Sequence, residues 1–168
     1  MIHVCSLTRL HDTVEQTRAQ HVVTLLRDVH LVQRPSTIID ANHLVLEMDD
    51  ISVAVDGYTM PGEEHVQKLL TFVHGWKRET PLVIHCFAGI SRSTAGAYVT
   101  ACALNPQRNE DVIAQQLRLN SPTATPNIRL VAVADHILGR QGRMVAAIEA
   151  IGRGQEAGEG HPFRLDLE

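Results

Sequence analysis

The sequence predicts a single α/β domain with a mostly parallel central sheet flanked by helices. Short β-branched or uniformly apolar segments alternate with amphipathic helical patterns, as expected when crossover helices join parallel strands. The length of 168 residues fits one globular domain with its own core. Apolar residues make up 44% of the chain and charged residues 20%, a balance typical of folded proteins rather than disordered ones.

The first part of the chain alternates strand and helix patterns. We expect a strand over 1–7, where Ile-His-Val-Cys alternates in polarity, followed by a polar, helix-tolerant stretch over 10–19. A second strand is predicted over 21–26, which is apolar and rich in β-branched residues. A third strand is predicted over 44–48.

A loop and the clearest helix come next. Residues 51–62 contain Asp-Gly and Pro-Gly without a sustained period, which indicates a loop. Residues 63–77 carry an apolar stripe that starts at Val66, with acidic residues at the beginning and basic residues at the end, as the helix dipole favours. Pro81 then precedes 82–85, a nearly uniformly apolar segment typical of a strand buried on both faces.

The second half of the chain is mainly helical. Residues 86–94 read Cys-Phe-Ala-Gly-Ile-Ser-Arg-Ser-Thr and precede a helix that ends before the Asn-Pro pair at 105–106. An amphipathic helix is predicted over 111–119. A last helix, capped by Asn127, is expected to reach about residue 138 and to resume after the glycines at 139–142.

The end of the chain differs in composition from the rest. From residue 152 the sequence is rich in Gly and Glu with little apolar content. We therefore expect a domain over residues 1–151 and a loosely ordered tail over residues 152–168. The turns that carry Arg140 and Arg143 are expected to lie on the solvated surface.

Composition excludes several functional classes. Acidic residues outnumber basic ones by 19 to 15, which argues against a nucleic-acid partner bound by a basic face. No apolar run approaches the ~20 residues of a membrane-spanning helix, and no signal peptide is recognisable. The cysteines Cys5, Cys86 and Cys102 form no Cys-x-x-Cys pair, so we expect a reducing cytoplasm, with Cys5 and Cys102 buried. The histidines show no metal-binding spacing, and we expect neither a metal nor an organic cofactor.

The loop of residues 86–92 joins the buried strand to the start of a helix. Backbone N–H groups of such a loop, with those of the helix start, form a concave anion site. Gly89 permits the positive φ that the curl needs, and the planar guanidinium of Arg92 can hold two phosphate oxygens. Cys86 lies at the base, where these dipoles and the positive charge favour a thiolate. The loop therefore predicts a thiolate nucleophile beneath a bound tetrahedral phosphate.

The sequence His-Cys-Phe-Ala-Gly-Ile-Ser-Arg-Ser at residues 85–93 resembles the signature of the cysteine-dependent protein tyrosine phosphatases, and the small dual-specificity-like members are the nearest match. The segment from Asp50 through the helix at 63–77 to Ser-Arg-Ser-Thr also resembles a group of predicted bacterial tyrosine phosphatases. The resemblance covers about residues 1–143 and is strongest at 82–96. Low-molecular-weight tyrosine phosphatases and arsenate reductases carry a similar loop near the N-terminus, whereas here it lies halfway along the chain.

The resemblance implies a phosphatase loop between a central strand and a helix, with a role for each residue. Cys86 attacks phosphorus and forms a phosphocysteine, and Arg92 holds the equatorial oxygens in the transition state. Ser93 donates a hydrogen bond to the departing thiolate, and His85 orders the loop from behind as a hydrogen-bonding group. The remaining substrate-binding residues are Phe87, Ala88, Gly89, Ile90 and Ser91.

The reaction also needs an acid for the leaving oxygen. In the family this acid is an Asp on a loop upstream of the nucleophile, and Asp49, Asp50 and Asp56 all precede Cys86 by a suitable distance. Asp50 is the first choice because its Asp-Ile pair resembles the family position. Asp56 lies in Asp-Gly-Tyr-Thr-Met-Pro, which resembles the acid loop of other tyrosine phosphatases, so Asp56 and Asp49 remain alternatives.

The resemblance implies hydrolysis of phosphate monoesters, with phosphotyrosine in proteins or a small phosphate monoester as substrate and no nucleic-acid or membrane partner. An inositol phosphate is less favoured, because Phe87, Ala88 and Ile90 provide no positive charge within the loop. Two other functions stay open. One is a phosphate-recognition module without turnover, and the other is a rhodanese-type sulfurtransferase, whose cysteine loop also binds an anion.

Overall fold

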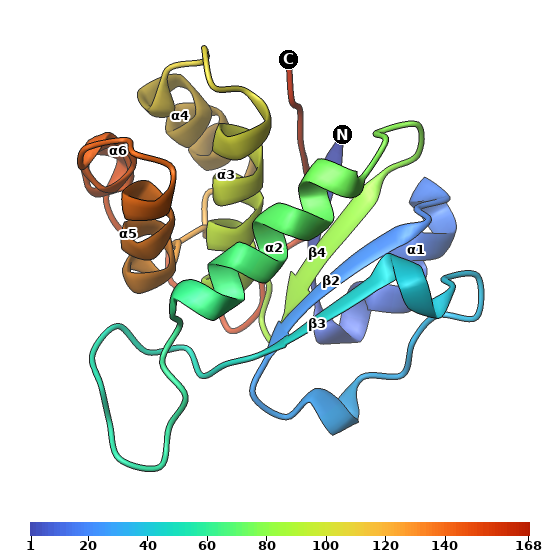
Figure 1. Cartoon of the computed structure of the whole chain (residues 1–168). Helices are drawn as coiled ribbons and strands as arrows, with labels where there is room; N and C mark the ends of the chain where they lie inside the picture. Colours follow the sequence, from blue (N-terminus) through green and yellow to red (C-terminus); the bar gives the residue numbers. More distant parts are fainter.

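The computed structural model describes residues 1–168 and shows a five-stranded sheet with helices on both faces (Figure 1). The strand order is β3-β2-β4-β1-β5, and only the last strand is antiparallel to its neighbour. This arrangement confirms the predicted α/β class with a mostly parallel sheet. The strands are β1 (Ile2–Ser6), β2 (His21–Leu26), β3 (His43–Glu47), β4 (Leu82–Cys86) and β5 (Phe163–Leu165).

The helices follow the predicted order and agree with the predicted bounds to within a few residues. Short 3-10 turns at Leu7–Arg9, Val29–Leu31 and Asp40–Asn42 occur in the connections of the first half. The α-helices are α1 (Leu10–Thr17), α2 (Glu63–Gly75), α3 (Arg92–Leu104), α4 (Glu110–Asn120), α5 (Ile128–Ile137) and α6 (Arg143–Ile151).

The two faces of the sheet have cores of different size. Helices α2 to α6 contribute to the larger core, whereas α1 packs with Val22 and Val83 on the opposite face. Side chains alternate between faces along each strand, so Ile84 joins the larger core while its neighbour Val83 joins the smaller one. Every residue of β4 is buried, as its uniform apolar sequence predicts. No helix is long and apolar enough to cross a membrane.

The C-terminal segment is ordered, contrary to the expectation of a loose tail over residues 152–168. Its strand β5 pairs with β1, with Leu165 opposite Ile2. Leu165 and Leu167 are buried. Composition was misleading here because the few large apolar residues lie near the end of the segment, where they complete one edge of the sheet.

The turn between α5 and α6 also differs from expectation, because Arg140 is only 6% exposed. Its guanidinium donates to a Glu110 carboxylate oxygen at 2.7 Å and to the Cys102 carbonyl at 2.7 Å. Arg143 lies at the surface, as expected, and donates to the same Glu110 oxygen at 3.2 Å. A buried ion pair thus joins the turn to Glu110 of α4. The sequence does not indicate this contact, because the two residues lie far apart in the chain.

Candidate active site

The site lies where β4 ends and α3 begins, at the carboxyl edge of the parallel strands. Parallel α/β sheets place their ligand sites at this edge. Cys86 is the last residue of β4 and Arg92 is the first residue of α3. Because β4 is central and α3 is buried along nearly its whole length, both residues are fixed by the core.

The sulfur of Cys86 lies inside the curl of the loop. The Gly89 N–H donates to Cys86 Sγ at 3.3 Å, and Ser93 Oγ lies 3.1 Å from the same atom. The sulfur of Cys86 therefore has two polar neighbours from its own loop and the start of α3. Burial raises the pKa of Cys5 and of Cys102 to about 12. These two thiols are buried in the core, as predicted, and stay protonated.

The carbonyl groups of the loop point away from its centre and are held by other elements. The Phe87 carbonyl accepts a hydrogen bond from the Leu7 N–H at 3.1 Å. The Ile90 carbonyl accepts one from the Thr125 N–H at 2.9 Å. Ala88 accepts from the Gly160 N–H at 2.9 Å. Because each peptide is planar, carbonyls that point outward turn the following N–H groups inward.

The inward N–H groups form the expected cradle. The Gly89 N–H donates to Cys86 Sγ. The other N–H groups of the loop make no hydrogen bond within the protein, and they belong to Phe87, Ala88, Ile90 and Ser91. Gly89 has φ of +72°, and a Cβ there would lie 2.8 Å from the backbone nitrogen of Ser6. Glycine is therefore required at this position for two reasons: the left-handed conformation and the close approach of β1.

Arg92 lies beside the cradle with part of its guanidinium unoccupied. The side chain is 8% exposed, and Nη1 donates to the Met48 carbonyl at 3.0 Å. The buried Nε has no hydrogen-bond partner. Leaving a buried donor unpaired costs about 1–3 kcal/mol, so this atom is well suited to an anionic ligand. The Met48 carbonyl fixes the direction of the fork.

His85 lies behind the loop and is fully buried. Its Nε2 is 2.7 Å from Thr24 Oγ1, and the same hydroxyl is 2.8 Å from His43 Nε2. Burial lowers the pKa of His85 to about 4, so the ring is neutral at physiological pH. The ring is held by Thr24 of β2, and its buried Nδ1 has no hydrogen-bond partner.

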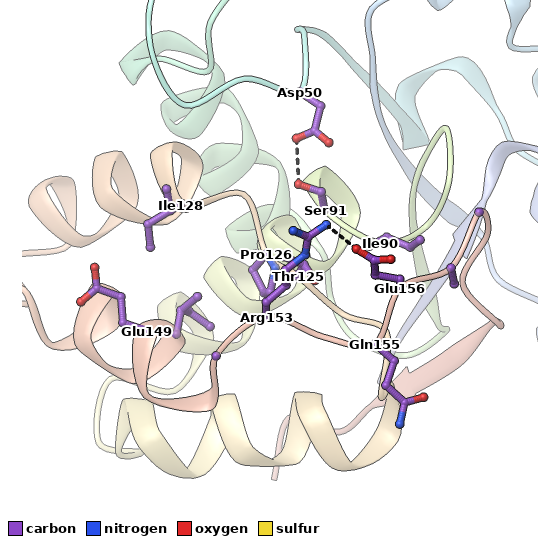
Figure 2. A pocket seen from close by; sticks show the side chains of 14 residues that line it. Asp50, Ile90, Ser91, Thr125, Pro126, Ile128, Glu149, Arg153, Gln155 and Glu156 are labelled. Atoms are coloured by element: carbon purple, nitrogen blue, oxygen red, sulfur yellow. Dashed lines mark hydrogen bonds and ion pairs between the residues drawn. The ribbon is translucent and has the colours of Figure 1, made fainter.

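Asp50 is the aspartate that contacts the loop of residues 86–92. Its Oδ1 accepts hydrogen bonds from Ser91 Oγ at 2.7 Å and from Asn127 Nδ2 at 2.8 Å. Figure 2 shows Asp50 above Ser91, joined by the first of these bonds. Asn127 is itself fixed as the cap of α5, since its Oδ1 accepts from the Leu130 N–H. Both donors bind one oxygen, and Oδ2 makes no hydrogen bond within the protein.

The other two aspartates have different surroundings. Asp49 is buried, and its Oδ2 accepts from the Thr59 N–H at 2.7 Å, so it closes the base of the loop after β3. The Arg27 guanidinium lies 3.4 Å from Asp49 Oδ1 and stacks on the Tyr58 ring. Asp56 is exposed on the same loop and lines neither of the two hollows beside Asp50. Of the three, Asp50 alone makes a hydrogen bond to the loop of residues 86–92.

Two hollows meet at Asp50. The smaller, of about 210 Å³, is lined by Asp49, Asp50, Arg92 and the 61% exposed ring of Phe87. The larger, of about 990 Å³, lies between the loop and the C-terminal segment, and Figure 2 shows the Arg153–Glu156 ion pair in its lining. Asp50 therefore has open space on two sides. No group of three or more His, Cys, Asp or Glu side chains could hold a metal ion.

Sequence reasoning missed several residues that shape this site. The sequence indicates Asn127 mainly as a helix cap and only secondarily as a site residue, because its bond to Asp50 joins segments far apart in the chain. Thr24 and the Met48 carbonyl have no sequence signature, since one is a strand hydroxyl and the other a backbone group. The contact of Gly160 with the loop was concealed by the apparently featureless composition around it.

Comparison with known proteins identifies the fold. No protein-family model and no curated protein matches the chain. Among solved structures, a Cydia pomonella PTP-2 phosphatase matches with a TM-score of 0.63 and 19% identity, covering 80% of this chain and 84% of that one. The human tyrosine phosphatase-like serine/threonine/tyrosine-interacting protein matches with a TM-score of 0.61 and 16% identity over 83% and 92%. PTPMT1 in complex with PI(5)P matches with a TM-score of 0.63 and 12% identity, covering 90% of this chain and 94% of that one.

The chain therefore has the fold of the dual-specificity and protein tyrosine phosphatases. The matched structures include phosphatases and one protein described only as phosphatase-like. Because the identities are low, the fold alone does not decide between catalysis and binding, and the side chains of the site must do so.

Proposed function

We propose that this protein is a phosphatase that hydrolyses phosphate monoesters through a phosphocysteine at Cys86. One observation carries the proposal: the sulfur lies within a ring of unpaired N–H groups, next to the unpaired Nε of Arg92. Unpaired buried donors are costly, and a dianionic phosphate would satisfy all of them at once.

The first step transfers the phosphoryl group to sulfur. The loop amides and Arg92 hold the non-bridging oxygens, and the Cys86 thiolate attacks phosphorus opposite the leaving oxygen. As the S–P bond forms, the bond between phosphorus and the leaving oxygen breaks. The proton on Asp50 Oδ2 passes to that oxygen, which leaves as an alcohol or phenol.

The second step releases inorganic phosphate. Water attacks the phosphocysteine, and Asp50, now a carboxylate, accepts a proton from it. The S–P bond breaks and its electron pair returns to sulfur. Ser93, 3.1 Å from Cys86 Sγ, donates to the thiolate and makes it a better leaving group.

For the substrate, we propose phosphotyrosine-containing proteins, with dual-specificity-like behaviour. Phe87 and Leu31 present exposed apolar side chains beside the smaller hollow, as suits an aromatic ring. The larger hollow next to Asp50 has room for residues that flank the phosphorylated one. The cysteines have no disulfide partners, and a reducing compartment such as the cytoplasm would keep Cys86 reactive.

Hydrolysis of p-nitrophenyl phosphate by the purified protein tests the proposal. We expect turnover between about pH 5 and 7, loss of activity in Cys86→Ser, and retention in Cys102→Ser, which makes the same change at a buried thiol. A wild-type protein that binds phosphotyrosine without releasing phosphate would contradict the proposal in favour of a recognition module. Transfer of sulfane sulfur to cyanide would contradict it in favour of a sulfurtransferase.

A further inference from the structure

We propose that Gly160 and Glu159 are positioning residues for the catalytic loop, so that the C-terminal segment sets the orientation of the amide that faces the nucleophile. The inference rests on the proposed function, because it assigns these residues to the reaction at Cys86. It concerns a segment whose composition predicted no role at all.

A single peptide unit connects the segment to the sulfur. The Gly160 N–H donates to the Ala88 carbonyl at 2.9 Å. That carbonyl belongs to the same planar peptide as the Gly89 N–H, which donates to Cys86 Sγ at 3.3 Å. Rotation of this peptide would weaken both bonds together. Hydrogen bonds in such a chain also polarise each other, so the outer bond strengthens the inner one.

The contact is tight enough to require glycine. A Cβ at Gly160 would lie 2.8 Å from the Gly89 carbonyl oxygen and 3.4 Å from a side-chain carbon of Ile90. The backbone of Gly160 is not left-handed, so another residue could adopt its conformation. The close approach to the loop is therefore the reason that glycine is needed here.

The opposite side of the same peptide is also confined. A Cβ at Gly89 would meet the backbone of Cys5 and Ser6, at the end of β1, within 3.1 Å. The Ala88–Gly89 peptide thus lies between the end of β1 and the C-terminal segment. Displacement by a side chain at residue 160 cannot be relieved by movement toward β1.

Glu159 ties the segment to β1. Its carboxylate accepts hydrogen bonds from Ser6 Oγ at 2.5 Å and from Thr8 Oγ1. These two hydrogen bonds, of which the one from Ser6 has the larger effect, hold the pKa of Glu159 below its ordinary value. Further back, the Gly154 N–H donates to Thr125 Oγ1 at 3.0 Å. The segment is therefore anchored at two points, residues 154 and 159, that precede its contact with the loop.

Two glycines in this segment offer a matched test. In Gly160→Ala the new Cβ would lie 2.8 Å from the Gly89 carbonyl oxygen, so the loop must move until this distance reaches the 3.4 Å of an ordinary contact. Because a misplacement of about 1 Å can cost about 100-fold in rate, we expect kcat/KM for p-nitrophenyl phosphate to fall at least about tenfold. Inhibition by vanadate should weaken in parallel. Gly158→Ala adds the same methyl group where nothing lies within 4 Å, and its activity should stay within about twofold of the wild type.

A second pair of variants keeps the test decisive if Gly160→Ala does not fold. Glu159→Ala removes the anchor to β1, whereas Glu64→Ala removes an exposed carboxylate that pairs with Lys68 on α2, away from both hollows. We expect slower alkylation of Cys86 by iodoacetamide at fixed pH in Glu159→Ala, with normal rates in Glu64→Ala. Rescue by Glu159→Gln, which keeps an acceptor oxygen, should be partial.

The possible failures can be told apart. An inactive wild-type protein would overturn the proposed function. An active wild type, with folded Gly160→Ala as active as Gly158→Ala, would overturn only the positioning role. If Gly160→Ala is unfolded, equal alkylation rates in Glu159→Ala and Glu64→Ala would overturn the positioning role in the same way.

Discussion

Replacement of Asp50 by Asn separates the proposed proton donor from the contacts that orient it. Asn keeps an acceptor oxygen for Ser91 Oγ and Asn127 Nδ2, which hold Oδ1 at 2.7 and 2.8 Å. The side chain should therefore stay in place. What disappears is the acidic proton on the second oxygen, so the change in rate reports proton transfer alone.

The magnitude depends on the leaving group. General acid catalysis contributes about 10²–10⁴ in rate, which corresponds to about 3–5 kcal/mol of the activation barrier. Phenyl phosphate releases a phenol similar to tyrosine, with a pKa of about 10, and should show the full loss in kcat. p-Nitrophenolate is a weaker base that leaves with less help from an acid, so its loss should be smaller.

Steady-state rates on both substrates test this prediction, with Asp56→Asn as the matched control. Asp56 is exposed on the loop after β3, and its variant should keep a rate within about twofold of the wild type on both substrates. Equal losses on the two substrates would refute the role of Asp50 as a proton donor. A loss confined to Asp56→Asn would assign that role to Asp56 instead.

Two further predictions concern buried charge. Burial lowers the pKa of His85 to about 4, below the 6.5 expected when unfolded, so its neutral form stabilises the fold above pH 6.5 and that contribution disappears as the pH falls toward 4. The free energy of unfolding measured in urea should decrease by up to about 3 kcal/mol as the pH falls over this range, and His85→Gln should abolish this decrease. The same pH dependence in the variant as in the wild type would contradict the prediction. Glu110→Gln leaves the buried Arg140 without its charge partner and should cost about 3–5 kcal/mol in urea unfolding. Asp166→Asn, which breaks an exposed pair, should cost less than about 1 kcal/mol, and similar losses in both variants would argue against this distinction.

The sequence was most informative where the relevant residues are contiguous. A buried strand, a loop and a helix start follow one another over residues 82–96, so local patterns alone predicted the strand–loop–helix order that the structure has. The alternation of strands and helices predicted the sheet class for the same reason, since each parallel strand carries its own apolar pattern. Between Asp50 and Asp56, sequence spacing could not decide, because the choice depends on which carboxylate the folded loop contacts.

Contacts between distant segments were beyond local reasoning. Asn127 meets Asp50, and Arg140 meets Glu110, only because the packing of the helices brings their elements together. The tail was misjudged because its role depends on backbone atoms, which composition does not reveal. Gly160 contributes an N–H group and the absence of a side chain, and neither has a recognisable pattern in a single sequence.

A crystal structure of the protein with vanadate tests the oxyanion cradle most directly. We expect vanadium bonded to Cys86 Sγ, equatorial oxygens held by the loop amides and by Nε of Arg92, and Oδ2 of Asp50 facing the apical oxygen. Vanadate bound elsewhere, or an empty loop at a concentration that saturates other cysteine phosphatases, would contradict the assignment of this loop as a phosphate site.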